Sequence, residues 1–544
     1  MSCHGLPDEI ASILASIVRI ARWLMVARLD RRTSLIHALV VTVAVTVVGL
    51  TLNSAQLKIP LNVATYDAHA FWSLDLAIDW VHCGRYSAHS ARYDLTHYLI
   101  AHNAETRDLP LPAILEKVAG SKEKYCSAVT EPFLNNENSL FYLFSALLSI
   151  HPNVTLAGLG VLLTWIRVAS LVFFVFTLLC VGASPVFALL TLMLGVEIAS
   201  LSAPTHLYSA YPFLLPFLGI YAGLLALTLR LDLHTKNRQL ALAAVLIGLF
   251  GGLFYNLRSS YLPIVVGCYL MFVAVIFFEA IRGNLPQASG RWKAVGIAVA
   301  GFCVGGGLFY LVFTYPLTRS GVTFNYTYHA VAHPLVLSLA LPPNALSQRE
   351  GIRWEDAVGL DLAHRVDPTA TFLGPSYERA LLTYYWRLWR QHPREMLSIY
   401  LAKWRLSTTG SATFVDANMS SLAKRLFGPT RYLQSGISFT VLFLVTVIAA
   451  LYLALRYSPS AGILVATLAG AGFFVTLESA IIMPFFFLQY HNAQLFVLFV
   501  TNLMFFQIVA NAACWLFTGN AHVQARASMS GKSTDGVVAA QPSR

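Results

Sequence analysis

The chain has 544 residues, of which 57% are hydrophobic and only 12% are charged. Ordinary soluble domains are about 25% charged, so this composition excludes a soluble enzyme as well as disordered, collagen-like and disulfide-scaffold proteins. The apolar residues exceed what one soluble core of this length could bury, which makes lipid the solvent for much of the surface. The formal net charge of +11 must therefore be assigned to the two sides of a membrane before it is taken as a sign of nucleic-acid binding.

The N-terminal residues predict an amphipathic helix on the membrane surface. Residues 10–29 are apolar but include Arg19, Arg22 and Arg28, a pattern typical of a helix lying in the interface. A signal peptide is the alternative, but no small-residue cleavage site follows a short apolar core.

A membrane-spanning helix needs about 20 apolar residues, because it must cross about 30 Å of hydrocarbon at about 1.5 Å per residue. The span expected at 184–201 ends in Glu197 and decides the orientation of everything after it. Ten spans are expected, near 36–56, 156–181, 184–201, 207–229, 239–256, 261–281, 294–315, 434–455, 461–484 and 494–517.

The Lys and Arg residues indicate the orientation. If the N-terminus is cytoplasmic, every short connection on that side is basic, whereas connections on the other face hold few cations apart from Arg258. This pattern follows the positive-inside rule. It predicts a multi-pass protein of the inner (plasma) membrane with both termini in the cytoplasm. The positive charge is then explained by topology, and no nucleic-acid partner is expected.

The expected fold is an all-α polytopic membrane protein of about ten transmembrane helices, with amphipathic membrane-surface helices and a mainly helical outer-face domain. Its parts are a cytoplasmic amphipathic segment (1–35), a first transmembrane helix (36–56), an outer loop (57–155), a transmembrane block (156–315), an outer-face, periplasmic domain (316–433), C-terminal transmembrane helices (434–517) and a disordered cytoplasmic tail (518–544).

Both outer segments carry helical patterns. In the first, Asp75 and Asp79 are four residues apart, on one face of an expected helix. In the second, SYERALLTYYWRLWRQHPREMLSIYLAKW has helical periodicity that is broken or kinked near His392–Pro393.

Two of the seven cysteines, Cys83 and Cys126, share the first outer segment. They could form a disulfide in an oxidising compartment or remain two buried thiols, and both readings stay open. No Cys or His spacing suggests a zinc site, and no DxD pair supports a bound divalent metal, so no metal is assigned.

Topology also predicts which polar residues can meet at the outer surface. Glu197 and Glu478 lie within a turn or two of the outer boundary, and Arg258 lies between two spans. Ionisable groups at such depth usually serve a pathway, a partner or a site, although a paired carboxylate or an Arg that reaches the headgroups is the plain alternative. The outward-facing candidates are Asp67, His69, Asp75, Asp79, Glu137, Glu197, His206, Arg258, His329, His333, Glu478, Tyr490 and His491.

At these residues the chain resembles the polytopic GT-C glycosyltransferases, in particular a bacterial, mostly uncharacterised branch. The stretch YDAHAFWSLDLAIDWVHCGRYS places an early acid after the first span, and NNENSLFYLFSALL forms an amphipathic segment before the second. A run of short-looped helices and a large outer segment follow.

The outer segment carries the more specific likeness. Its matching elements are His333–Pro334, Gly351, Trp354, Asp356, Ala357, Pro375, Tyr377, Glu378, His392–Pro393 and Lys403. The chain departs from the family after His333–Pro334, where Leu335 and Val336 replace an aromatic residue or a further His.

The resemblance implies a glycosyltransferase that uses a polyprenyl-phosphate or polyprenyl-diphosphate sugar donor. A phosphate leaving group is stable as an anion, so the reaction needs one general base and cations for the phosphate rather than a strong general acid. The match to the early acid makes Asp67 the expected base, with a helix N-cap as its structural alternative. Glu137 is the second candidate, as a base or acceptor-binding residue.

Arg258 is expected to bind the donor phosphate through its paired donors, assisted by His206, His329 or His491. The other site candidates are His333, Tyr490, Glu197 and Glu478. The polyprenyl tail requires only an apolar groove between spans, for which FFFLQY (485–490) and YNLRSSYLP are candidate linings. The acceptor is a glycan, a lipid or a protein.

Three alternatives stay open at this point. A polysaccharide polymerase or ligase of the outer face would use a similar lipid donor. A transporter or flippase of lipid-linked sugars would place polar groups near the bilayer midplane and often show internal repeats; the sequence shows no repeat between its halves. A scaffold role is the third.

Overall fold

The computed structural model describes residues 34–58, 71–84, 89–127, 139–202, 213–257, 261–281, 288–319, 331–372, 374–418, 420–427 and 458–482, with a few isolated positions. Within these ranges the chain is helical and has no β-strand, only an isolated bridge between Pro110 and Thr155. The expected all-α membrane class is confirmed.

Among the described residues, six helices are long and apolar enough to cross a membrane. They are α2 (Leu35–Leu52), α10 (Leu156–Cys180), α13 (Asn237–Tyr255), α14 (Leu262–Ile281), the helix Trp292–Arg319 that contains most of α15 (Ala288–Phe309), and α24 (Pro459–Ile481).

Two further predicted spans, at 184–201 and 207–229, form the shorter apolar helices α11 (Pro185–Ser202) and α12 (Leu214–Arg230). Those predicted at 434–455 and 494–517 lie largely outside the described residues, as do the N-terminal amphipathic segment and the C-terminal tail.

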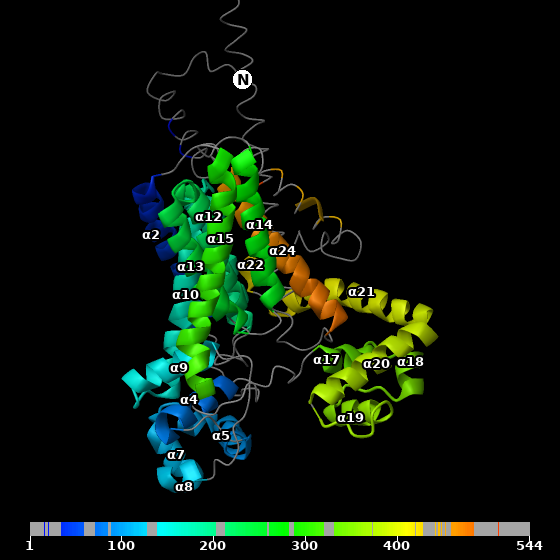
Figure 1. Cartoon of the computed structure of the whole chain (residues 1–544). Coiled ribbons are helices and arrows are strands. Elements are labelled where there is room, and N and C mark those ends of the chain that lie inside the picture. Colours follow the sequence, from blue (N-terminus) through cyan, green and yellow to red (C-terminus); the bar gives the residue numbers. More distant parts are fainter. Residues whose placement is uncertain are drawn as a thin grey trace, which may run out of the picture.

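The long helices stand side by side as a bundle (Figure 1). Hydroxyl groups inside it bond along their own helices: Thr42 donates to Ala38 O at 2.7 Å, Thr164 to Gly160 O at 2.9 Å, and Thr228 to Leu224 O at 2.8 Å. These bonds satisfy polar groups that neither lipid nor an apolar core could satisfy.

A group of short helices, the α4–α9 region, caps one end of the bundle, which is the lower end in Figure 1 and is called the α4 end below. Its apolar core is continuous with that of the bundle. Gly84 and Gly120 end α4 and α7 with φ of 65° and 81°, a left-handed turn that glycine adopts without strain. The helices are α3 (Ser54–Lys58), which leads into the region, then α4 (Trp72–Cys83), α5 (His89–Ala101), α6 (Asn103–Thr106), α7 (Leu111–Ala119), α8 (Lys122–Ser127) and α9 (Ser139–Ile150).

A second group of helices, the α17–α20 region, lies beside the α4 end (Figure 1) and has an apolar core of its own. It comprises α17 (Ala332–Leu337), α18 (Ala345–Glu350), α19 (Asp356–His364) and α20 (Pro375–Gln391). The next helix, α21 (Pro393–Asn418), leads back to the bundle and is followed by α22 (Ser421–Phe427). The break between α20 and α21 at His392–Pro393 confirms the predicted break.

Candidate functional site

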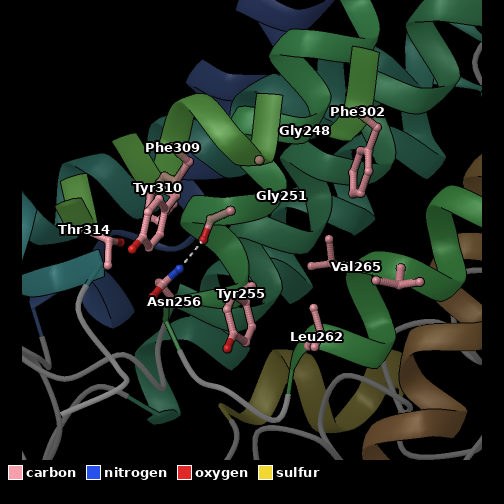
Figure 2. A pocket seen from close by; sticks show the side chains of 13 residues that line it. Gly248, Gly251, Tyr255, Asn256, Leu262, Val265, Phe302, Phe309, Tyr310 and Thr314 are labelled. Atoms are coloured by element: carbon pink, nitrogen blue, oxygen red, sulfur yellow. Dashed lines mark hydrogen bonds between the residues drawn. The ribbon is translucent and has the colours of Figure 1, made fainter. Parts of the chain in front are cut away.

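An apolar groove of about 240 Å³ opens between α13, α14 and α15 in the half of the bundle nearest the α4 end (Figure 2). Its walls are mainly glycine, valine, leucine and phenylalanine residues. The polar groups of Tyr255, Asn256 and Thr314 lie where α13 ends, and the Asn256 amide donates to Gly252 O at 2.9 Å. The groove therefore combines an apolar body with a polar end.

Glycines on α13 and α15 create this groove. A Cβ on Gly248 would collide with the backbone carbonyl of Phe302, and one on Gly305 with that of Val245. The two helices therefore cross backbone to backbone, as small residues allow in membrane helices. At Gly306 and Gly307, by contrast, a Cβ would meet nothing within 4 Å, and Gly306 lines the groove. Of these three successive glycines, Gly305 is therefore the one that permits the close helix packing.

The polar end of the groove is shaped by a change in helix type. After Phe309 the chain makes a π-helical turn over Tyr310–Thr314 before α16 (Tyr315–Arg319). Such turns often occur at functional sites. Tyr142 of α9 packs its ring against Phe309 at 6.2 Å and Phe313 at 5.2 Å between centroids, so the α4–α9 region adjoins the groove.

Buried carboxylates lie in the α4–α9 region, where the expected helix carries Asp75 and Asp79 on one face. Tyr125 donates to Asp79 Oδ1 at 2.6 Å and lies 3.4 Å from Asp75 Oδ1, while Thr96 donates to Asp75 Oδ2 at 3.0 Å. Burial, followed by the two carboxylates, raises the pKa of Tyr125 well above its usual value, so the phenol stays a neutral donor. Because both Asp side chains have 0% exposure, this cluster holds α4, α5 and α8 together rather than meeting a substrate.

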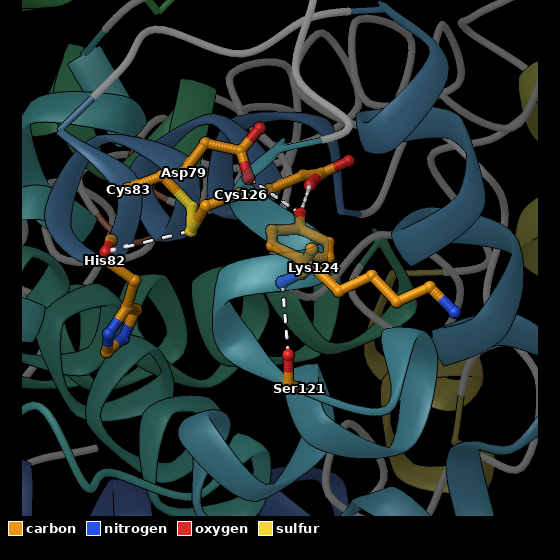
Figure 3. The surroundings of a disulfide bond; sticks show 8 residues. Asp79, His82, Cys83, Ser121, Lys124 and Cys126 are labelled. Atoms are coloured by element: carbon orange, nitrogen blue, oxygen red, sulfur yellow. Dashed lines mark hydrogen bonds between the residues drawn. A yellow bond between two sulfur atoms is a disulfide. The ribbon is translucent and has the colours of Figure 1, made fainter.

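A disulfide lies beside this cluster and joins α4 to α8 (Figure 3). It links Cys83 to Cys126, whose Cα atoms are 5.3 Å apart. Of the two readings left open by the sequence, the disulfide is therefore the one the structure has. The Cys126 sulfur also lies 3.9 Å from the backbone oxygen of His82.

A buried arginine in the middle of α10, Arg167, was not among the sequence candidates. Its side chain is 3% exposed; Nε donates to Leu163 O at 3.2 Å and Nη2 to Thr164 Oγ1 at 3.1 Å. Nη1 has no hydrogen-bond partner within the described part of the chain, although the guanidinium lies 5.6 Å from the Phe213 ring centroid. An ionisable residue inside a span is costly and usually functional.

A small cavity of about 10 Å³ adjoins Arg167 and is also lined by Leu57 of α3, Thr164 of α10 and Ser200 of α11. That volume has room for about one water. A single Arg in the apolar run LAGLGVLLTWIRVASLVFF was the sequence signal for this position. It lies in the middle of a span, whereas the sequence candidates lie toward the outer surface.

The predicted candidate His333 is buried in the α17–α20 region. Its Nδ1 makes a short hydrogen bond with the Tyr377 hydroxyl, and its Nε2 lies 3.3 Å from Asp356 Oδ1. Glu378 accepts the backbone N–H of Ala332 at 2.9 Å, and its burial raises the pKa of that carboxyl. The structure thus brings together His333, Asp356, Tyr377 and Glu378 of the GT-C-like pattern, in a contact that links α17, α19 and α20.

The other two candidates that the structure describes lie on different helices. Glu197 of α11 is 3% exposed and accepts the backbone N–H of Ser420 at 2.6 Å, directly before α22. Glu478 is half-buried near the end of α24. A contact of this kind is what the structural alternative for Glu197 predicts.

Most of the predicted site lies outside the described residues: Asp67, Glu137, His206, Arg258, His329, Tyr490 and His491. Arg258 follows directly on Leu257 at the end of α13, and Glu137 comes two residues before α9. Among the residues that are described, no group of three or more His, Cys, Asp or Glu is arranged to hold a metal.

Comparisons of the chain with protein-family models, curated proteins and solved structures find no match.

Proposed function

We propose that this protein is an integral-membrane glycosyltransferase of the GT-C type. It transfers a sugar from a polyprenyl-phosphate or polyprenyl-diphosphate donor to a glycan, lipid or protein acceptor at the periplasmic face, with inversion. In this proposal the chain crosses the inner membrane ten times with both termini in the cytoplasm, and the α4 end is the periplasmic end.

The groove between α13, α14 and α15 is the observation that carries the proposal. A polyprenyl phosphate is a long apolar chain with an anion at one end. An apolar cleft with a polar mouth suits such a ligand, since ligand sites combine an apolar lining with a few placed polar groups. The groove has its polar residues at Tyr255, Asn256 and Thr314. Arg258 follows two residues after Asn256, close enough along the chain to serve a phosphate at that mouth.

The chemistry assigned to the site follows from the leaving group. Arg258, with His206, His329 or His491, balances the charge on the departing phosphate. Asp67 acts as general base on the acceptor hydroxyl, and Glu137 assists by binding the acceptor. Tyr490, Glu478 and His333 are the remaining candidates for contacts with the sugar or acceptor.

The decisive experiment measures sugar transfer by purified protein with a panel of polyprenyl-phosphate sugars. Wild type is compared with Asp67→Asn, which keeps the shape of the side chain but removes its basicity; we expect a loss of about 10²–10⁴-fold in transfer rate. Full activity in Asp67→Asn would remove Asp67 as the base. A product ladder on a glycan acceptor would instead indicate a polymerase, and lipid translocation without a glycosylated product would indicate a flippase.

A matched pair of glycine variants tests the groove. Gly306→Leu places a side chain into the groove, whereas Gly307→Leu adds the same side chain one residue away, outside the lining. Both changes replace glycine in a helix, so their effects on helix propensity are similar. We expect Gly306→Leu to raise the KM for the lipid donor and Gly307→Leu to leave it unchanged. Equal KM values would exclude the groove as the donor site.

A third variant tests whether Arg167 also binds an anionic ligand. Arg167→Met removes a buried cation whose Nη1 has no partner among the described residues, so it should leave stability unchanged or raise it, since replacing buried ionic groups by apolar ones often does so. If Arg167 binds a phosphate, transfer is lost in the same stable variant and partly restored in Arg167→Lys. Transfer at the wild-type rate in Arg167→Met would leave Arg167 without a part in the reaction.

A further inference from the structure

The helix pair α20–α21 has an exposed apolar face to which the proposed function gives no role. Leu382 and Trp386 of α20 are 41% and 54% exposed, and Leu397 and Leu401 of α21 are 54% and 61% exposed. The region has an apolar core of its own. Four further large apolar side chains that are exposed on two adjacent helices therefore indicate a surface that a partner or a membrane covers. These four residues are called the hairpin face below.

The four side chains lie on one side of the hairpin. The two helices pack through Tyr385 and Tyr400, whose hydroxyls are 2.9 Å apart. Trp386 follows Tyr385 by one residue, and Leu401 follows Tyr400 by one residue. Each side chain is therefore rotated by about 100° from the contact, in the same direction when each helix is viewed from its own N-terminus. Because α21 doubles back along α20 (Figure 1), equal rotations bring both exposed pairs to the same side.

That side is turned toward the membrane body. Trp404 packs its ring 6.1 Å from that of Phe473, which lies eight residues inside the end of the span α24. Leu401 and Leu397 come three and seven residues before Trp404, on the same face of the helix. Lys403 donates to the last carbonyl of α24, Ile481 O, at 2.8 Å, so this part of α21 lies at the end of the span. The hairpin face therefore continues the apolar surface of the span.

The charges around the hairpin face select an anionic partner. Besides the buried Lys403, residues 375–405 contain five arginines and two acidic residues. Both carboxylates are engaged elsewhere: Glu395 with Arg349 at 2.8 Å, and Glu378 with the backbone of Ala332. Arg390 and Arg394, at the turn between the helices, are exposed. Apolar side chains beside exposed arginines are typical of a surface that rests on anionic lipid headgroups.

We propose that the hairpin face docks the α17–α20 region onto the bilayer, with Leu382, Trp386, Leu397 and Leu401 in the interface and Arg390 and Arg394 on the phosphates of anionic lipids. This proposal does not depend on the glycosyltransferase assignment. A region held in this way keeps a fixed height above the membrane plane, which the single helix α21 would not ensure by itself.

The test uses the full chain in proteoliposomes made with lipids brominated near the headgroup, which quench tryptophan fluorescence at short range. The signal of Trp386 is obtained by subtracting Trp386→Phe, and the matched control is Trp354→Phe, which removes a tryptophan packed against the core of the same region. We expect the Trp386 signal to be quenched by the brominated lipid and shielded from aqueous acrylamide, and the Trp354 signal not to be quenched by the lipid.

The charge requirement is tested by varying the fraction of anionic lipid. Arg394→Gln should reduce the ratio of docked to undocked region about fivefold, since one basic residue near such a surface contributes about that factor. Arg353→Gln, an exposed arginine in the same region outside α20 and α21, should change nothing. Three outcomes would each overturn the proposal. Trp386 could be quenched by acrylamide alone, or it could be protected from both quenchers because a second copy covers the face. The third is that neither the fraction of anionic lipid nor Arg394→Gln changes the docking.

Discussion

The α4–α9 region and the α17–α20 region both lie at the α4 end, yet they are attached to the bundle in different ways. The core of the α4–α9 region is one continuous cluster with that of the bundle, whereas the α17–α20 region has a separate core. In the described part of the chain, two side chains link the second region to the bundle: Trp404 of α21 packs against the core of the bundle, and Ile481 of α24 packs against the core of the α17–α20 region.

Polar interactions follow the same division. Inside the first region, Asp75, Asp79 and Tyr125 tie helices together at 0–2% exposure next to a disulfide. At the joint of the second region, Lys403 donates to Ser338 Oγ and to Ile481 O, each at 2.8 Å. The first region is thus an extension of the bundle, and the second is a unit joined to it by a few side chains. Each should therefore respond differently when a contact is removed.

Removing the disulfide should give the largest effect. It closes a loop with a sequence separation of 43, and loss of such a crosslink costs about 2–5 kcal/mol. In Cys83→Ser with Cys126→Ser we expect hydrogen exchange to accelerate in α4, α9 and the adjoining bundle and to stay unchanged in α20. Cys303→Ser, at an exposed free cysteine, is the control. Equal acceleration in α20 would show that the two regions unfold together.

The Lys403 joint should make the attachment of the second region depend on pH. Burial lowers the pKa of Lys403 from 10.5 to about 7. Between these two values the unfolded chain binds more protons than the folded one, so stability rises with pH, by at most about 1.4 kcal/mol per pH unit. Denaturant unfolding of the wild type, monitored by hydrogen exchange in α17 and α20, should show this rise in stability between about pH 7 and 10.5.

The matched variants for this prediction are Lys403→Met, which should abolish the rise, and Lys117→Met, at an exposed lysine of α7, which should keep it. A rise that persists in Lys403→Met would assign the pH dependence to another group.

Local features of the fold were predictable because they depend on neighbours in the sequence. The break at His392–Pro393 follows from the effect of proline on the preceding residue, and the helical face of Asp75 and Asp79 follows from their spacing of four. Apolar helices form at the spans predicted at 184–201 and 207–229, but neither is among the six helices that are long and apolar enough to cross a membrane. Apolar runs locate such helices more reliably than they fix their lengths.

Contacts between distant segments were not predictable in this way. The Cys83–Cys126 pairing depends on α8 lying against α4, and the partner of His333 is 44 residues away at Tyr377. The groove depends on the crossing of α13 and α15 at particular glycines, such as Gly248 and Gly305, which lie far apart in the sequence. Arg167 is visible in the sequence as a single cation in an apolar run, but it lies in the middle of a span, whereas the predicted site residues lie toward the outer surface. The GT-C resemblance and the assignment of Asp67 stay predictions.

The smallest expected effect concerns the hydrogen bond that holds the second region's own core. Tyr377 is 0% exposed and bonds to His333 Nδ1, and Gly359 leaves the space for this contact, because a Cβ there would meet the Tyr377 hydroxyl. Tyr377→Phe keeps the ring but leaves the imidazole nitrogen buried without its partner, which costs about 1–3 kcal/mol. We expect hydrogen exchange to become faster in α17, α19 and α20 and to stay unchanged in α4 and α9. The control is Tyr315→Phe, at a 46% exposed tyrosine of α16. Because the cores are separate, a loss of this size should stay within the α17–α20 region. Its appearance in α4 would mean that the joint at Lys403 and Ile481 couples the two regions as strongly as a shared core.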